Sequence, residues 1–181
     1  MSQTKAQLLN PLGELSSSDV TVNSILIGKG VNSVAGNTVL GESALDASVS
    51  GGNNTALGHK TLTSNTSGNA CVAVGYRALL NNTTAANNVA VGNDSMKDNT
   101  TGASNTAVGS NALVANTTAG NNTAVGRTAL GSNTTGEFNV AVGALSLDAN
   151  TTADNNTAVG TAALGANTTG PDNVAVGANA L

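Results

Sequence analysis

A glycine recurs every 17 residues through most of this chain. Each one closes a five-residue motif, which reads Asn-Thr-Ala-Val-Gly at 105–109, 122–126 and 156–160. An uninterrupted repeat of about this length is typical of a solenoid, in which each unit buries its apolar side chains only against its neighbours. The repeating glycines are Gly41, Gly58, Gly75, Gly92, Gly109, Gly126, Gly143, Gly160 and Gly177.

The composition excludes several classes of protein. The 181 residues include one Phe, one Tyr and no Trp, which is too little large apolar surface for a thick globular core. Only 9% of residues are charged, so the chain does not have the composition of a disordered segment. A net charge of −4 without a basic stripe argues against nucleic-acid binding. No apolar run reaches the roughly 18 residues of a membrane span, and the N-terminus lacks the apolar run of a signal peptide, so we expect cytoplasmic synthesis without membrane insertion.

The residue types within each repeat favour strands over helices. Asn, Thr, Gly and Val are poor helix formers, whereas Asn-Thr-Ala-Val can form a short strand that ends at a corner glycine with positive φ. A small residue followed by Leu predicts a second short strand, and Asn-Thr-Thr-Gly a second corner. We therefore predict an all-β fold, a parallel β-solenoid or β-roll of 17-residue coils. With coils about 4.8 Å apart, nine of them make a rod on the order of 40 Å long.

The repeat also divides the chain. Residues 28–181 are expected to form the rod, and residues 1–27, which do not repeat, a separate N-terminal attachment segment. Ser24–Gly28 resembles the later motifs without their spacing, as an atypical terminal repeat would.

Stacked coils place identical residues above one another. A column of asparagines should therefore bond through its side-chain amides up and down the rod, as Asn ladders do in cross-β arrays. The predicted ladder is Asn65, Asn82, Asn99, Asn116, Asn133, Asn150 and Asn167.

Strand alternation gives the motif two unlike faces. It puts Thr123 and Val125 on one face and Asn122, Ala124 and Gly126 on the other. We expect the first face to suit a small core and the Ala/Gly face to suit close approach by another backbone. About one Val and one Leu per coil is little apolar burial for a chain that folds alone. An oligomer of three chains around one axis is therefore predicted.

The motif resembles a known repeat. Asn-Val-Ala-Val-Gly at 88–92, 139–143 and 173–177, with its Thr variant, is similar to the head repeats of trimeric autotransporter adhesins. Those heads are left-handed parallel β-rolls made of three chains. The fuller unit, with Ala-Leu and Asn-Thr-Thr-Gly, is similar to repeats in tail-fibre-like virion proteins of bacteriophages. The resemblance covers residues 24–181 and implies a homotrimeric fibre.

Three functional hypotheses follow. The first is a structural virion component: a trimeric tail fibre or appendage, made in the host cytoplasm, that docks on another virion protein through its N-terminal segment and contacts a host surface glycan or protein. The second is the head of a bacterial surface adhesin, although those carry a signal peptide and a membrane anchor that this sequence lacks. The third is ice binding, because Thr ladders on a flat solenoid face can order water. Against the third, the two Thr of each corner should point in different directions.

Enzymatic chemistry finds little support, and no cofactor or metal is expected. His59, the only histidine, has no nucleophile in a Gly-x-Ser-x-Gly elbow and is expected to be a solvated corner residue. Cys71 replaces the motif asparagine, where a small stacked side chain is more plausible than a reactive thiol. The carboxylates follow no calcium-binding repeat, and no glycine leads into the Gly-Lys-Ser/Thr of a phosphate loop.

The two residues after each motif glycine vary most from coil to coil. They include three of the six basic residues and the only His and Tyr, which makes this line of positions the candidate receptor-facing surface. The alternative is that these positions are simply exposed and free to vary. The candidates are His59, Lys60, Tyr76, Arg77 and Arg127.

Overall fold

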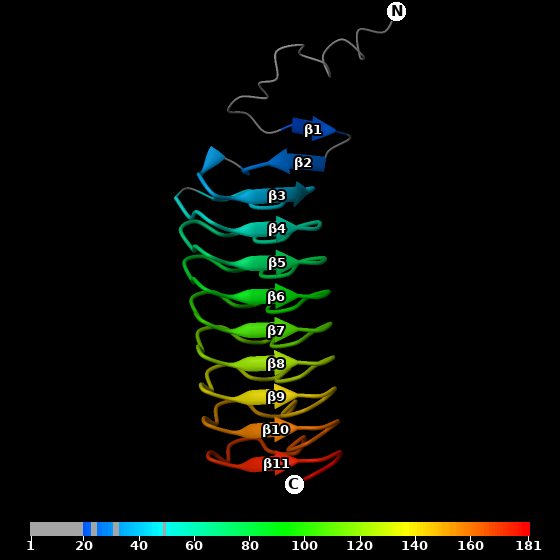
Figure 1. Ribbon diagram of the computed structural model, residues 1–181. Helices are drawn as coiled ribbons and strands as arrows, with labels where there is room; N and C mark the ends of the chain where they lie inside the picture. Colours follow the sequence, from blue (N-terminus) through cyan, green and yellow to red (C-terminus); the bar gives the residue numbers. More distant parts are fainter. Residues whose placement is uncertain (1–19, 23–24, 31–32, 49) are drawn as a thin grey trace, which may run out of the picture.

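The protein is an all-β rod in which one short strand is stacked above the next. The computed structural model describes residues 20–22, 25–30, 33–48 and 50–181 (Figure 1). Within them, one sheet contains strands β1 to β11 in sequence order. At the N-terminal end lie β1 (Val20–Val22) and β2 (Ile25–Gly28). The stacked strands are β3 (Thr38–Gly41), β4 (Thr55–Leu57), β5 (Val72–Val74), β6 (Val89–Val91), β7 (Thr106–Val108), β8 (Thr123–Val125), β9 (Val140–Val142), β10 (Thr157–Val159) and β11 (Val174–Val176).

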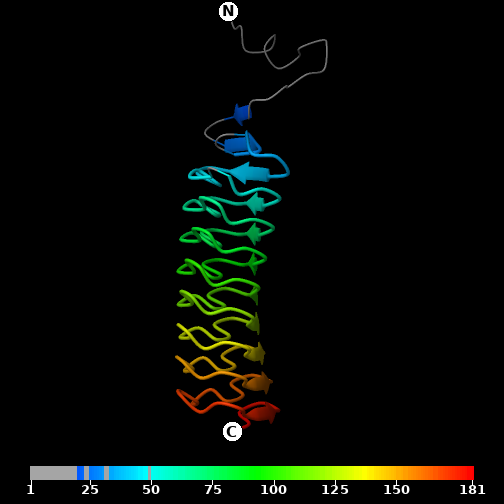
Figure 2. The same ribbon diagram turned by 90° about the vertical axis from the view of Figure 1, so that its left-hand side faces the viewer.

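The register of the stacked strands follows the sequence repeat. From β3 to β11 every pairing is parallel and joins residues 17 apart, as Thr106 with Thr123. Figure 2 shows these strands in one column on one side of the rod, with the rest of each coil on the other side. The predicted parallel β-solenoid of 17-residue coils is confirmed.

The motif glycines turn the chain out of each strand. Their φ angles lie between +126° and +153°, a region that residues with a Cβ rarely adopt. Close approach is a second requirement, because a Cβ on Gly109 would overlap the carbonyl oxygen of Gly126 in the next coil. The prediction of a corner glycine is confirmed.

The predicted second strand does not form. In one representative coil, Asn111 and Leu113 have φ angles of 57° and 50°, on either side of Ala112. Left-handed residues at alternate positions are incompatible with an extended strand. The backbone is still paired between coils, because the N–H of Leu113 donates to the carbonyl of Ala129 at 3.0 Å. Leu113 is fully buried, and this burial offsets the cost of the left-handed conformation.

The interior of the rod holds the small face of each strand. Ala124 and Asn122 are 0% and 1% exposed, whereas Thr123 and Val125 point outward and are half-buried. The interior position is Ala in every strand from β4 to β11, and in β3 it is Val39, which is 2% exposed. The expectation that Thr and Val form the core while the Ala/Gly face receives another chain is therefore wrong. The Ala face is covered by the chain itself.

The predicted asparagine ladder forms over most of its length. Each side-chain amide from Asn82 to Asn150 donates to the carboxamide oxygen of the asparagine one coil earlier, at 2.8–3.3 Å. Asn167 differs, because its amide donates to the carbonyl of Gly170 instead. Within the described residues, Oδ1 of Asn150 is left without a hydrogen-bond partner, so the ladder ends there.

A second asparagine column, not foreseen from the sequence, lies inside the strands. The backbone N–H of Asn122 donates to Oδ1 of Asn105 at 2.9 Å, and Nδ2 of Asn122 donates to the carbonyl of Gly136 at 2.8 Å. The motif asparagine therefore bonds in both directions along the rod. The column is Asn37, Asn54, Asn88, Asn105, Asn122, Asn139, Asn156 and Asn173, with Cys71 in the remaining slot.

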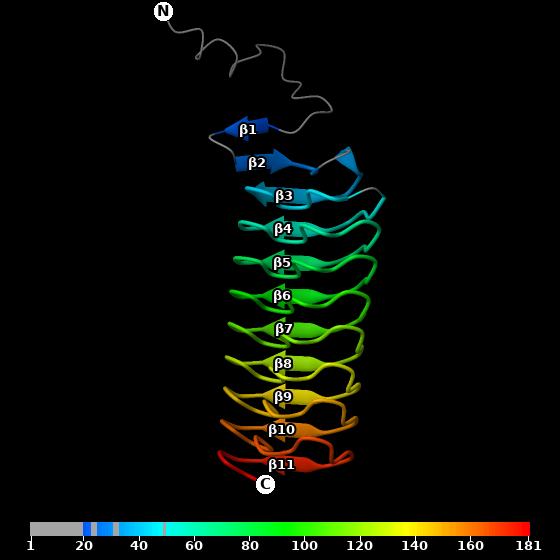
Figure 3. The ribbon, with the colours of Figure 1, turned by 180° about the vertical axis from the view of Figure 1, so that it is seen from behind.

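The N-terminal end of the sheet is antiparallel. Strand β2 pairs with β3 through Leu26 and Gly41, and β1 pairs antiparallel with β2 (Figure 3). Ile25–Gly28 therefore belongs to the sheet without forming a first parallel coil, which differs from the expected terminal repeat. Most of the predicted attachment segment, residues 1–19, lies outside the described residues. In the described part of the chain, no helix has the length and apolar character needed to cross a membrane.

Candidate functional site

The variable residues after the motif glycines form one edge of the rod, which we call the ridge. It follows the strand ends, so residues 17 apart lie on neighbouring coils. His59, Lys60 and Tyr76 are exposed and Arg77 is half-buried. These four predicted residues come together on two adjacent coils. Arg127 is also exposed, but it occupies the position of Tyr76 three coils further along and lies apart from them.

Tyr76 is held by two neighbours on the ridge. Its ring centroid lies 5.5 Å from that of His59, with the rings tilted by 52°, and Cζ of Arg77 lies 4.6 Å from the same centroid. Ring pairs and cation–π contacts at these distances are favourable. The Tyr76 side chain, 41% exposed, is thus presented to solvent in a defined orientation.

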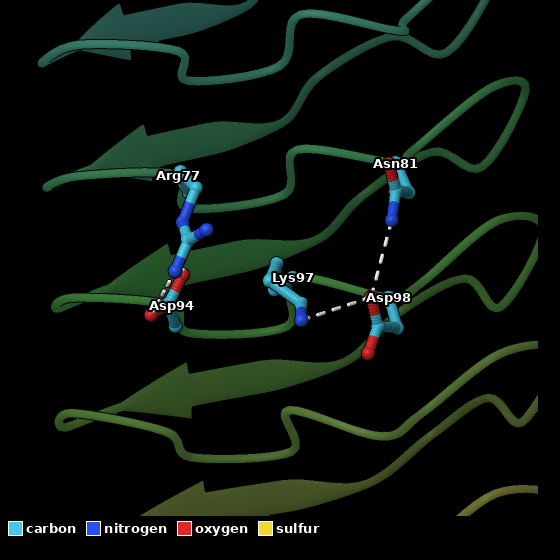
Figure 4. A network of polar contacts seen from close by, with 5 residues as sticks. All are labelled: Arg77, Asn81, Asp94, Lys97 and Asp98. Atoms are coloured by element: carbon cyan, nitrogen blue, oxygen red, sulfur yellow. Dashed lines mark hydrogen bonds and ion pairs between the residues drawn. The ribbon is translucent and has the colours of Figure 1, made fainter.

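Arg77 forms an ion pair between coils (Figure 4). Its Nε and Nη2 donate to the two carboxylate oxygens of Asp94 at 2.7 and 2.8 Å. These hydrogen bonds raise the pKa of the guanidinium above its ordinary value. Arg77 and Asp94 are 17 residues apart, so stacking of the coils places their opposite charges side by side. The sequence contained this signal, but the pair was not predicted from it. Arg77 therefore has a structural partner, and its charge is not free for a receptor.

A second polar contact lies beside the first (Figure 4). Nζ of Lys97 lies 3.4 Å from Oδ1 of Asp98, and Nδ2 of Asn81, one coil earlier, donates to the same oxygen at 3.1 Å. Both pairs are at least partly exposed, so each is worth little stability. They help to fix the side chains of this part of the surface.

Cys71 lies inside the rod. It is fully buried, and its backbone N–H donates to Oδ1 of Asn54 at 2.9 Å. Burial raises the pKa of its thiol, which stays protonated and unreactive at neutral pH. Among the described residues, no three His, Cys, Asp or Glu side chains are grouped to hold a metal ion.

The strands present a second surface, which we call the outward face, made of the first and third residues of β3–β11. It carries no charge, and Leu57 and Val108 on it are 43% and 37% exposed. The sequence did not predict this surface, because the Thr and Val side chains were expected to form the core. The outward face is Thr38, Leu40, Thr55, Leu57, Val72, Val74, Val89, Val91, Thr106, Val108, Thr123, Val125, Val140, Val142, Thr157, Val159, Val174 and Val176.

Comparison of the chain with known protein families, curated protein sequences and solved structures found no significant match. Among the described residues, the ridge and the outward face are the candidate surfaces for contact with another molecule.

Proposed function

We propose that the chain is a structural component of a bacteriophage virion, a homotrimeric fibre in which three parallel rods pack along their outward faces. The observation that carries the proposal is the outward face itself. It is an uncharged strip of Val, Leu and Thr that continues through all nine stacked strands. The likeness of its motif to the repeats of tail-fibre-like proteins supports the virion assignment.

The physical case for association is the apolar area that remains in contact with water. Large continuous apolar patches on a soluble chain commonly mark contacts with another molecule. Covering the strip removes apolar surface from water at about 25 cal/mol per Å² and desolvates no charge. Rods related by a rotation axis present the same coil at the same height, so identical rungs meet along the whole length.

A lysine on the outward face tests the interface. Val108→Lys should shift the protein from three-chain to one-chain species in sedimentation velocity, because the interface would bury an unpaired charge. The matched control is Ser110→Lys, on the ridge, where Arg127 occupies the same position in another coil. It should sediment as the wild type does. Equal sedimentation of the two variants would remove the outward face from the interface.

A test of the virion assignment requires purified phage particles. Gold-labelled antibodies against the rod should mark an appendage on phage particles whose genome encodes the chain. Purified particles that contain none of the chain by mass spectrometry would contradict the assignment. A gene product extending into a signal peptide and membrane anchor would favour the surface adhesin.

Ice binding is the second candidate, because one observation favours it. Thr106 and Thr123 are paired neighbours in one column of the outward face, which also contains Thr55 two coils before Val89. The corner threonines are less suitable, because the Thr100 hydroxyl donates to the carbonyl of Thr117. Ice and a trimer would compete for the same face. Thermal hysteresis by a one-chain species would support ice binding, and its absence would dispose of it.

A further inference from the structure

We infer that His59, Lys60 and Tyr76 form a binding site on the ridge for an oxyanion, a carboxylate or phosphate group carried by a surface polysaccharide. The three side chains lie on two adjacent coils and are all exposed. An ammonium, a phenol hydroxyl and an imidazole N–H are all hydrogen-bond donors, and a charged donor binds an oxyanion most strongly. The inference depends on the proposed fibre only for the increase in avidity that three copies of the site would give.

The rod itself does not require these residues. At the position of His59 and Tyr76, other coils carry Asn93, Ser110 and Ala144 with the same backbone conformation and the same 17-residue register. The solenoid therefore tolerates small neutral side chains here. The placement of the chain's only histidine and only tyrosine at adjacent positions is not explained by folding.

Of the two cationic side chains next to His59 and Tyr76 on the ridge, one can contact an anionic ligand without first breaking an ion pair. Arg77 is neutralised by Asp94, and among the described residues Lys60 forms no ion pair. Glu42 lies one coil before His59 at the same position of the ridge and limits the site on that side. The three donor residues lie on two adjacent coils, which suits a single carboxylate or phosphate group and not an extended anionic surface.

The ring contacts favour binding because they fix the donors in advance. Tyr76 is constrained by His59 at 5.5 Å and by Arg77 at 4.6 Å, so less side-chain entropy is lost when its hydroxyl binds. In a three-chain fibre the site occurs three times at one height. A repetitive polysaccharide can occupy more than one copy, which raises the overall avidity.

Three immobilised polymers test the inference by biolayer interferometry: polygalacturonate for carboxylate, poly(glycerol phosphate) for phosphate and dextran as the neutral control. The protein of residues 1–181 should bind at least one anionic polymer and not dextran, and comparison of the two anionic polymers identifies the group that is bound. Lys60→Gln should weaken that binding about tenfold, the loss of one charged hydrogen bond. Arg127→Gln removes an equally exposed charge three coils away and should leave binding within about twofold of the wild type.

Equal weakening by Lys60→Gln and Arg127→Gln, or no preference over dextran, would overturn the inference. The fibre proposal is judged separately, by the sedimenting mass of the same samples. A one-chain species whose binding depends on Lys60 would keep the site and remove the fibre. A three-chain species without such binding would do the reverse.

Discussion

Buried asparagine side chains hold successive coils of this rod together. Nδ2 of Asn99 donates to Oδ1 of Asn82 at 2.9 Å and to the carbonyl of Gly102 at 3.0 Å, away from water. A buried amide left without a partner costs about 1–3 kcal/mol, so each ladder penalises a slipped coil. The polar columns thus contribute specificity of register, while the apolar core consists mainly of Ala and Leu, with Val39 and Met96.

Restoring the interrupted second column, that of the motif asparagines, should stabilise the protein. Cys71 offers only its sulfur to the backbone N–H of Asn88, whereas the next coil offers Oδ1 of Asn88 to the N–H of Asn105 at 2.8 Å. Cys71→Asn should raise the free energy of unfolding by about 1 kcal/mol, measured by chemical denaturation. Cys71→Ala is the control and should give no gain. An asparagine variant less stable than the wild type would show that the column of motif asparagines does not act as described.

The corner glycines should tolerate substitution by alanine to different extents, because the atoms that an added Cβ would meet differ from one glycine to another. A Cβ at Gly109 would overlap the carbonyl of Gly126, so Gly109→Ala should cost several kcal/mol and separate the coils locally. Gly177 has a similar φ of 126°, but its nearest atom to a Cβ would be that of Ala180 at 3.9 Å. Gly177→Ala should therefore cost only the backbone strain, about 1 kcal/mol. Equal losses of melting temperature in the two variants would contradict this difference.

At the scale of elements, the features that follow from the 17-residue spacing were predicted from the sequence. The features that depend on packing inside the rod were not. The strand, the corner glycine and the first asparagine ladder follow from the 17-residue spacing. The prediction of a second strand was wrong because nothing in the sequence indicates that the residues on either side of Ala112, which are Asn111 and Leu113, are left-handed. Alternation predicts two faces but not which of them is inside, and the structure places Ala124 inside and Val125 on the outward face.

The candidate site was predictable to a similar degree. Variability after the motif glycine placed the ridge, and the coil register brought His59 beside Tyr76. The Arg77–Asp94 pair and the exposed outward face required the stacked arrangement, because neither is a local pattern in the sequence.

The coil should behave as a removable unit. Deleting residues 106–122 joins Asn105 to Thr123 and keeps every later residue in register, so the shortened rod should retain cooperative thermal unfolding and its circular dichroism. Deleting residues 106–121 removes one residue fewer and displaces every later side chain from its column. That variant should unfold at a clearly lower temperature. Similar melting curves for the two deletions would contradict a register fixed by 17-residue coils.

At the scale of the whole molecule, the N-terminal end of the sheet and the two long surfaces differ in what they can contact. The antiparallel strands β1 and β2 cover the edge of β3, which blocks parallel stacking of another rod at that end. The association that we propose is therefore lateral, through the outward face. The ridge, at the strand ends, remains available for recognition.

Sedimentation equilibrium of the intact protein tests this account most directly. Three chains packed along their outward faces predict a single species of three times 17.5 kDa, independent of loading concentration. A single species of 17.5 kDa at all concentrations would contradict the proposed fibre.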